Sequence, residues 1–169
     1  MAIDTTVSTD RTIDDSNLAG IGGWLLLVAI GLIFSPIRMV MQFWPLYQTV
    51  YFDGVTWQAL NDTSSSTYVP YLAELIVVET VLNAMLLAAA LVLIVMFFTR
   101  RRVFPKLYIA LAVASIVVLV GDALVGGMLL SEAAFDPDTA KEIARSLVGA
   151  AIWIPYMLVS RRVKATFTR

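Results

Sequence analysis

The chain contains no cysteine and no histidine. Without cysteine it can form no disulfide, no thiolate metal site and no thiol nucleophile. Without histidine it lacks the usual axial ligand of haem, the commonest side-chain ligand of zinc and copper, and the most frequent general base near neutral pH. An enzyme built from this sequence would have to work with carboxylates, arginine and hydroxyl groups, so we expect no cofactor and no metal.

Charge is also scarce, because only 15% of the 169 residues are charged whereas 59% are hydrophobic. Soluble domains are about a quarter charged, so this chain has too few charged residues for one. Its mean hydropathy of +0.81 also indicates that lipid surrounds most of it. The basic residues gather mainly at 100–106 and 161–169, and the acids at the N-terminus and in the other loops. Basic clusters of this kind mark the cytoplasmic side of a membrane and its anionic headgroups, so nucleic acid is not an expected partner.

Four long apolar segments predict an all-α integral membrane four-helix bundle. The expected spans are about 21–43, 69–98, 103–130 and 140–160, within a transmembrane domain at 21–160. Helices are expected because an open sheet would leave backbone polar groups unpaired in hydrocarbon. The fourth helix should start before its apolar stretch, since Asp136 suits an N-cap and Pro137 the first helical position.

The loops predict the topology. The loop at 99–106 carries four basic residues and should be cytoplasmic, whereas the loop at 44–68 has no lysine or arginine and should lie outside. Both termini are then cytoplasmic: a disordered acidic leader at 1–20 and a basic tail at 161–169. No basic segment precedes the first apolar run, so we expect a retained helix in a multi-pass protein of the bacterial inner (plasma) membrane.

The outer loop at 44–68 is rich in aromatic residues. Its Asp53-Gly54 pair, between two short β-prone stretches, indicates a hairpin. The competing interpretation is a short helix at Trp57–Leu60 lying at the membrane interface. We favour the interfacial helix, because aromatic side chains at a membrane surface need no partner strand.

Each apolar segment carries a charged side chain, in chain order Arg38, Glu79, Asp122 and Arg145. Counting ~1.5 Å per residue from the basic end of each segment places all four ~22–30 Å along, in the half of the bilayer away from that end. Two cations and two anions at one level on neighbouring helices can compensate each other, where lone charges would be costly. Small and polar residues share the helix faces of these charges, so those faces should point into the bundle.

The candidate site comprises Arg38, Glu79, Asn83, Asp122, Arg145, Trp153 and Tyr156. In one interpretation the arginines pair with the acids as a structural lock, and Arg38→Ala should then destabilise the fold. In another they line a water-filled pocket open to the outside, where the arginines hold an anionic headgroup or carboxylate and an acid takes up a proton. In a third, some charges snorkel to the interface. Trp153 and Tyr156 could stack a ligand, but core packing is the safer expectation.

Two stretches resemble a known family. Gly20-Ile21-Gly22-Gly23-Trp24-Leu25, continuing to Ser35-Pro36-Ile37-Arg38, is similar to the opening of the bacterial domain of unknown function family 2569. Ile152-Trp153-Ile154-Pro155-Tyr156, continuing to the basic tail, is similar to its closing segment. The resemblance implies a four-span inner-membrane protein and carries no chemistry. The residues that it singles out are Gly23, Trp24, Ser35, Pro36, Arg38, Trp153, Pro155 and Tyr156.

We therefore expect a non-enzymatic multi-pass inner-membrane protein. Its outward-facing buried charge cluster would bind a small anionic or lipid ligand, or a helix of a membrane partner protein. The alternative is a proton-coupled small-molecule carrier acting as a homodimer, in which Glu79 or Asp122 exchanges a proton for substrate. A membrane enzyme using these two carboxylates is the least favoured hypothesis, since the sequence shows neither a metal motif nor a recognisable nucleophile.

Overall fold

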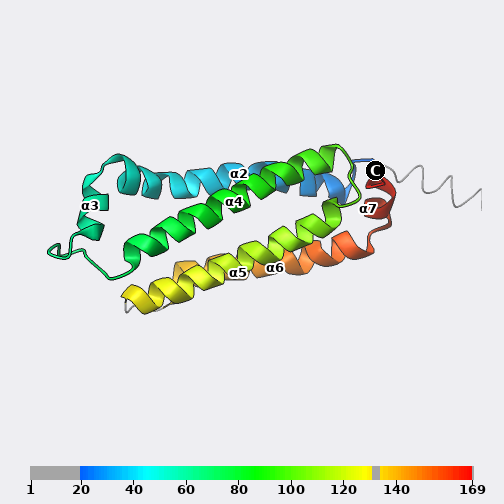
Figure 1. Cartoon of the computed structure of the whole chain (residues 1–169). Helices are drawn as coiled ribbons and strands as arrows, with labels where there is room; N and C mark the ends of the chain where they lie inside the picture. Colours follow the sequence, from blue (N-terminus) through cyan, green and yellow to red (C-terminus); the bar gives the residue numbers. More distant parts are fainter. Residues whose placement is uncertain (1–19, 131–133, 169) are drawn as a thin grey trace, which may run out of the picture.

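A computed structural model describes residues 20–130 and 134–168, so the leader expected at 1–20 lies, but for residue 20, outside the described residues. Its long helices are α2 (Trp24–Tyr47), α4 (Leu72–Phe98), α5 (Phe104–Leu130) and α6 (Pro137–Val159). They lie lengthwise beside one another (Figure 1). Each is long and apolar enough to cross a membrane. The prediction of an all-α membrane four-helix bundle is confirmed, and the chain is a multi-pass membrane protein.

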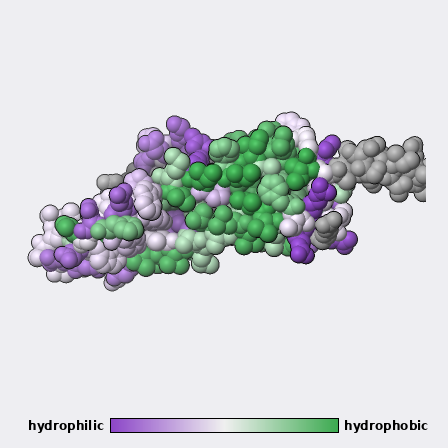
Figure 2. All heavy atoms as spheres, turned by 90° about the horizontal axis from the view of Figure 1, so that it is seen from above, coloured by the Kyte–Doolittle hydropathy of each residue, from purple (hydrophilic) through white to green (hydrophobic). Residues whose placement is uncertain are grey.

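The four helices pack in chain order. α2 packs along α4, α4 along α5, and α5 along α6. Within the described residues α2 and α6 make few close backbone contacts with each other, and we call the side between them the open side of the bundle. On the face seen in Figure 2, an apolar band covers the middle of the bundle and polar side chains lie at both ends. Lipid chains solvate such a band, because it offers no unpaired backbone groups.

The tightest packing is at the end where α2 begins and α4 ends. We call it the basic end, because the basic residues clustered at 100–106 and 161–164 lie there. Phe97 and Phe104 are both 0% exposed, and their ring centroids are 5.2 Å apart in an edge-to-face arrangement. Phe167 stacks on Phe104 at a centroid distance of 4.5 Å. Aromatic pairs of this geometry stabilise more than their buried area alone.

A short helix, α7 (Arg161–Thr166), closes the basic end (Figure 1). The Thr166 hydroxyl donates a hydrogen bond to the Gly20 carbonyl at 3.2 Å and accepts one from the Gly20 amide at 3.1 Å. The Arg162 guanidinium lies over Gly22, where an added Cβ would come within 3.0 Å of its Nη1. These contacts join the C-terminal segment to the start of α2.

The first helix is longer than the span expected at 21–43. α2 runs to Tyr47, and the π-helical segment η1 (Gln48–Phe52) continues it. Ring contacts one turn apart support the extension, since the Phe43 and Tyr47 centroids are 6.0 Å apart and those of Tyr47 and Tyr51 6.2 Å.

After η1, the left-handed backbone of Gly54 (φ 68°) leads into α3 (Val55–Asn61). The short helix expected at Trp57–Leu60 is therefore present. The competing hairpin is wrong, because no strand occurs in the described part of the chain. The position of α3 at the membrane interface stays a prediction.

The fourth helix begins as expected. The Asp136 carboxylate accepts hydrogen bonds from the Thr139 amide at 3.0 Å and the Asp138 amide at 2.8 Å, and Pro137 occupies the first turn. These bonds, the one from the Thr139 amide foremost, lower the pKa of Asp136 below its ordinary value. An N-cap of this kind satisfies amides that have no partner within the helix.

Candidate functional site

The four long helices enclose a cavity of about 530 Å³, which we call the bundle cavity. Its wall includes Arg38 from α2, Glu79 and Asn83 from α4, Asp122 from α5 and Trp153 from α6. These residues, far apart in the sequence, therefore face one space. Pockets that bind small molecules usually measure about 300–1,000 Å³, so the bundle cavity has room for one such ligand.

The wall changes in character along the bundle. Its described charged residues all lie in the half away from the basic end; they are Arg38, Glu79, Asp122 and Glu142. The half nearer the basic end is mainly apolar and includes Leu27, Leu32, Ala90, Leu93 and Leu111. The bundle cavity is thus amphipathic along its length.

Glu79 and Asp122 form the centre of the polar half. They lie near enough for their charges to interact, although they belong to different helices. The Asn83 side chain, only 7% exposed, lies beside Glu79 and beside the Tyr47 hydroxyl. That hydroxyl is buried and has no hydrogen-bond partner among the described residues. Two carboxyl groups, an amide and a phenol therefore meet at one level.

The predicted structural lock, in which the arginines pair with the acids, is not found among the described residues. Among the residues that the structure describes, no ion pair joins Arg38 or Arg145 to Glu79 or Asp122. Arg38 is exposed on the open side between α2 and α6, and the half-buried carboxyl groups lie on α4 and α5. None of these four side chains is fully buried either, which corrects the prediction of a buried cluster; Arg38, Glu79 and Asp122 line the bundle cavity.

Arg145 does not line the bundle cavity. It borders a neighbouring cavity of about 290 Å³, the side pocket, whose other wall residues are Arg38, Gln42, Asp138, Lys141 and Glu142. Arg38 is common to both cavities. Sequence reasoning left Asp138 and Lys141 out of the site, although they lie seven and four residues before Arg145 and therefore share its helix face.

A hydrogen bond spans the open side of the bundle at the level of the side pocket. Gln42 Nε2 donates to the Glu142 carboxylate at 3.3 Å and 3.4 Å, joining α2 to α6. At the basic end the contacts of α7 with Gly20 connect the same two sides. Between these two bridges α2 and α6 make few close backbone contacts.

Tyr156 lies outside the bundle cavity. Its ring contacts Trp153 edge to face, with centroids 5.9 Å apart, and both residues pack on the apolar core of the basic end. Tyr156 is therefore a core residue, whereas Trp153 also lines the bundle cavity near that end. The wall further contains Thr139 and Ser146 from α6. The sequence did not single them out, because they precede the apolar stretch that starts at Leu147.

Comparison with known proteins identifies the family and no activity. Residues 18–168 match the family described as "Protein of unknown function (DUF2569)". No curated protein and no solved structure matches the chain. The family match extends over all four long helices and both cavities, and it confirms the resemblance of the two end segments. The chain therefore belongs to the DUF2569 family.

Proposed function

We propose that this protein is a non-enzymatic protein of the bacterial inner membrane that binds a lipid-like anionic ligand between its helices. The observation that carries the proposal is the bundle cavity, which is polar in one half and apolar in the other, and is bordered by α2 and α6, which make few close backbone contacts. An amphiphile has the same division between headgroup and chain. Burial of the chain against the apolar half would favour binding, and the polar half would orient the headgroup.

The anionic group of the ligand would bind where the two cavities meet. Arg38 borders both, and the side pocket adds Lys141 and Arg145 beside the acids Asp138 and Glu142. Guanidinium groups bind phosphate and carboxylate through paired, charge-assisted hydrogen bonds. Arg38 has no carboxylate partner within the described residues, so its donors are available to a ligand.

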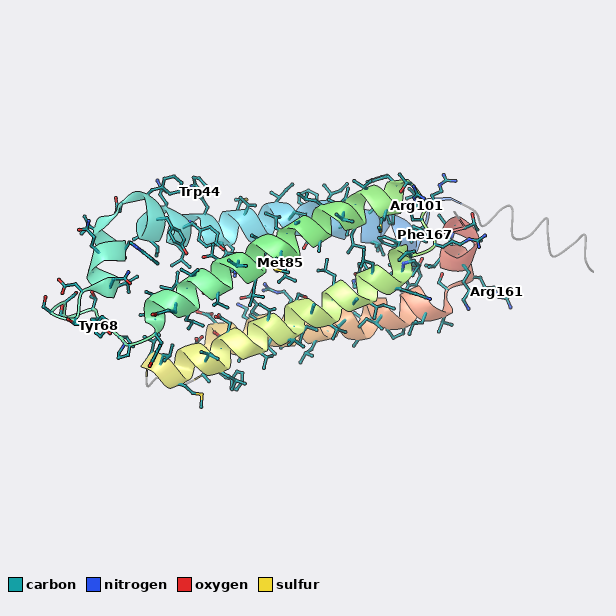
Figure 3. All side chains as sticks on the ribbon, in the orientation of Figure 1. Trp44, Tyr68, Met85, Arg101, Arg161 and Phe167 are labelled. Carbon is teal, nitrogen blue, oxygen red and sulfur yellow. The ribbon has the colours of Figure 1, made fainter. Side chains whose placement is uncertain are left out.

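We further propose that the basic end faces the cytoplasm. Arg101 and Arg161 lie together at that end in Figure 3, on the α4–α5 loop and on α7. Lysine and arginine accumulate in cytoplasmic loops of membrane proteins. With both termini on that side, the polar half of the bundle cavity lies in the leaflet away from the cytoplasm, and the ligand belongs to that leaflet.

The test fills the bundle cavity without disturbing the fold. Gly31 lines the cavity, and an added Cβ there meets no atom within 4 Å, so Gly31→Leu should fold and occupy ligand space. Gly121→Leu is the matched control, because a Cβ there also meets nothing within 4 Å and Gly121, about 100° around α5 from Asp122, does not line the cavity. Native mass spectrometry of the purified protein should show retained lipid for the wild type and the control, and its loss for Gly31→Leu. Equal retention by all three proteins would contradict the proposal, as would retention by none.

A proton-coupled carrier acting as a homodimer is the second candidate. The proximity of Glu79 and Asp122 favours it, since neighbouring carboxyl groups can hold a proton between them. Four helices are few for a transport path, so two copies would be needed. Vesicles with an imposed pH gradient test this function: substrate uptake that depends on the gradient and disappears in Glu79→Gln supports it, and uptake unaffected by the gradient counts against it.

A further inference from the structure

The charges of the bundle cavity follow a fixed order along its length. Leu25, Phe97 and Phe104 pack in one cluster, so they give α2, α4 and α5 a common level. Counting ~1.5 Å per residue from there places Arg38 ~20 Å along the bundle and both Glu79 and Asp122 ~27 Å along. From the basic end outward, a ligand therefore meets an apolar wall, then a guanidinium, then a pair of carboxyl groups.

This order suits a ligand that carries both signs of charge. A purely anionic headgroup that extended past Arg38 would meet Glu79 and Asp122, and like charges in a cavity of low dielectric repel strongly. A positive group at that level would instead neutralise the two carboxylates. The third described acid of the wall, Glu142, accepts its hydrogen bond from Gln42 at the rim.

We propose that the ligand is a zwitterionic amphiphile whose phosphate binds Arg38 and whose terminal primary ammonium lies between Glu79 and Asp122. The inference rests on the proposed function and names its ligand class: a phosphatidylethanolamine-type lipid. In such a lipid the order is acyl chain, phosphate, ammonium, the same as the order of complementary groups along the wall. About 7 Å along the bundle separates the Cα level of Arg38 from the Cα level of the two acids, which the flexible arginine side chain and a two-carbon linker can bridge.

The hydrogen-bonding groups at the carboxyl level favour a primary ammonium over a quaternary one. A primary ammonium has three donors, and Glu79, Asp122 and the Asn83 amide offer acceptors for them. Quaternary ammonium groups are bound by cages of several aromatic rings. Of the aromatic residues in the wall, Tyr108 and Trp153 lie towards the basic end, and Phe43 is the only one near the carboxyl level among the described residues.

The apolar half and the open side favour a lipid over a soluble zwitterion. Free phosphoethanolamine would present the same charges but leave the apolar half of the cavity unfilled. A lipid can place one acyl chain there and a second between α2 and α6, which make few close backbone contacts. Soluble phosphoethanolamine should therefore bind more weakly than the lipid.

The experiment uses the full chain, delipidated in detergent and titrated with four compounds in native mass spectrometry. They are phosphatidylethanolamine, phosphatidylglycerol and phosphatidylcholine with the same acyl chains, and soluble phosphoethanolamine. We expect phosphatidylethanolamine to bind at least about tenfold more tightly than the other two lipids. Glu79→Gln and Asp122→Asn should each remove most of this preference. Glu74→Gln is the matched control, since Glu74 is exposed on the same helix and does not line the cavity, and it should keep the preference.

The outcomes separate the two proposals. Equal or tighter binding of phosphatidylglycerol, or a preference that survives both Glu79→Gln and Asp122→Asn, overturns the zwitterionic ligand and leaves lipid binding intact. Equal binding of phosphatidylcholine overturns the role of the primary ammonium. Soluble phosphoethanolamine binding as tightly as the lipid overturns a lipid source. If no lipid binds more tightly to the wild type than to Gly31→Leu, the proposed function itself fails.

Discussion

Arg38→Ala distinguishes a ligand-binding arginine from a structural counter-ion. Breaking a buried ion pair usually costs 3–5 kcal/mol, on the order of 6–20 °C in melting temperature for a chain of this size. Arg38 is exposed and makes no ion pair with a described carboxylate, so that penalty does not apply. We expect the free energy of unfolding to change by less than about 0.5 kcal/mol, or roughly 1–2 °C.

The same substitution should weaken ligand binding strongly. A hydrogen bond to a charged group contributes about 1.5–3 kcal/mol, so loss of the guanidinium should reduce lipid affinity by about 10–150-fold. A melting assay in detergent measures the first effect and lipid titration by native mass spectrometry the second. Arg161→Ala is the matched control, because it removes an exposed guanidinium from α7 that lines neither cavity. A melting temperature lower by about 10 °C, or unchanged lipid affinity, would refute the reasoning.

Three further predictions concern the fold. Phe104→Ala should cost about 3–5 kcal/mol in detergent unfolding because the ring is 0% exposed, whereas Phe98→Ala, 51% exposed, should cost far less; similar losses would be evidence against a core at the basic end. Thr166→Val should lose about 1–3 kcal/mol with its two hydrogen bonds and speed proteolysis of α7, and Thr168→Val should not. Asp136→Ala should lower the melting temperature at neutral pH. Because the folded pKa of Asp136 lies below its ordinary 3.8, this difference should persist above pH 3.8 and vanish as the pH falls through the folded value; a difference independent of pH would contradict the cap.

The sequence predicted the helices well where composition alone decides them. Long apolar runs in lipid must be helical, and the Asp136-Pro137 pair marked the start of α6 although four charged residues follow before the apolar stretch. The extension of α2 through Pro45 to η1 was missed. Its aromatic residues suit an interfacial loop as well as a helix, and ring contacts between successive turns, which depend on the fold, favour the helix.

The sequence predicted how far along the bundle the charged residues of the site lie, but not which neighbouring helix each side chain faces. The rise per residue is fixed, so counting places Arg38, Glu79 and Asp122 in the same half of the bundle. Which helix each side chain faces depends on the order of packing, and that order leaves α2 and α6 apart. The arginines and acids expected in contact are therefore separated by a cavity, and Arg145 borders the side pocket instead.

The concentration of tight packing at the basic end gives the bundle a mechanical asymmetry. The aromatic cluster of Phe97, Phe104 and Phe167 acts as a pivot, and the distant halves of the helices are long arms attached to it. A tilt of about 10° at Leu25 would carry the Cα of Arg38 roughly 3–4 Å, while the rings at the pivot barely shift. In these distant halves the described side-chain hydrogen bond between α2 and α6 is that of Gln42 with Glu142, so a relative tilt of the two helices would lengthen this bond.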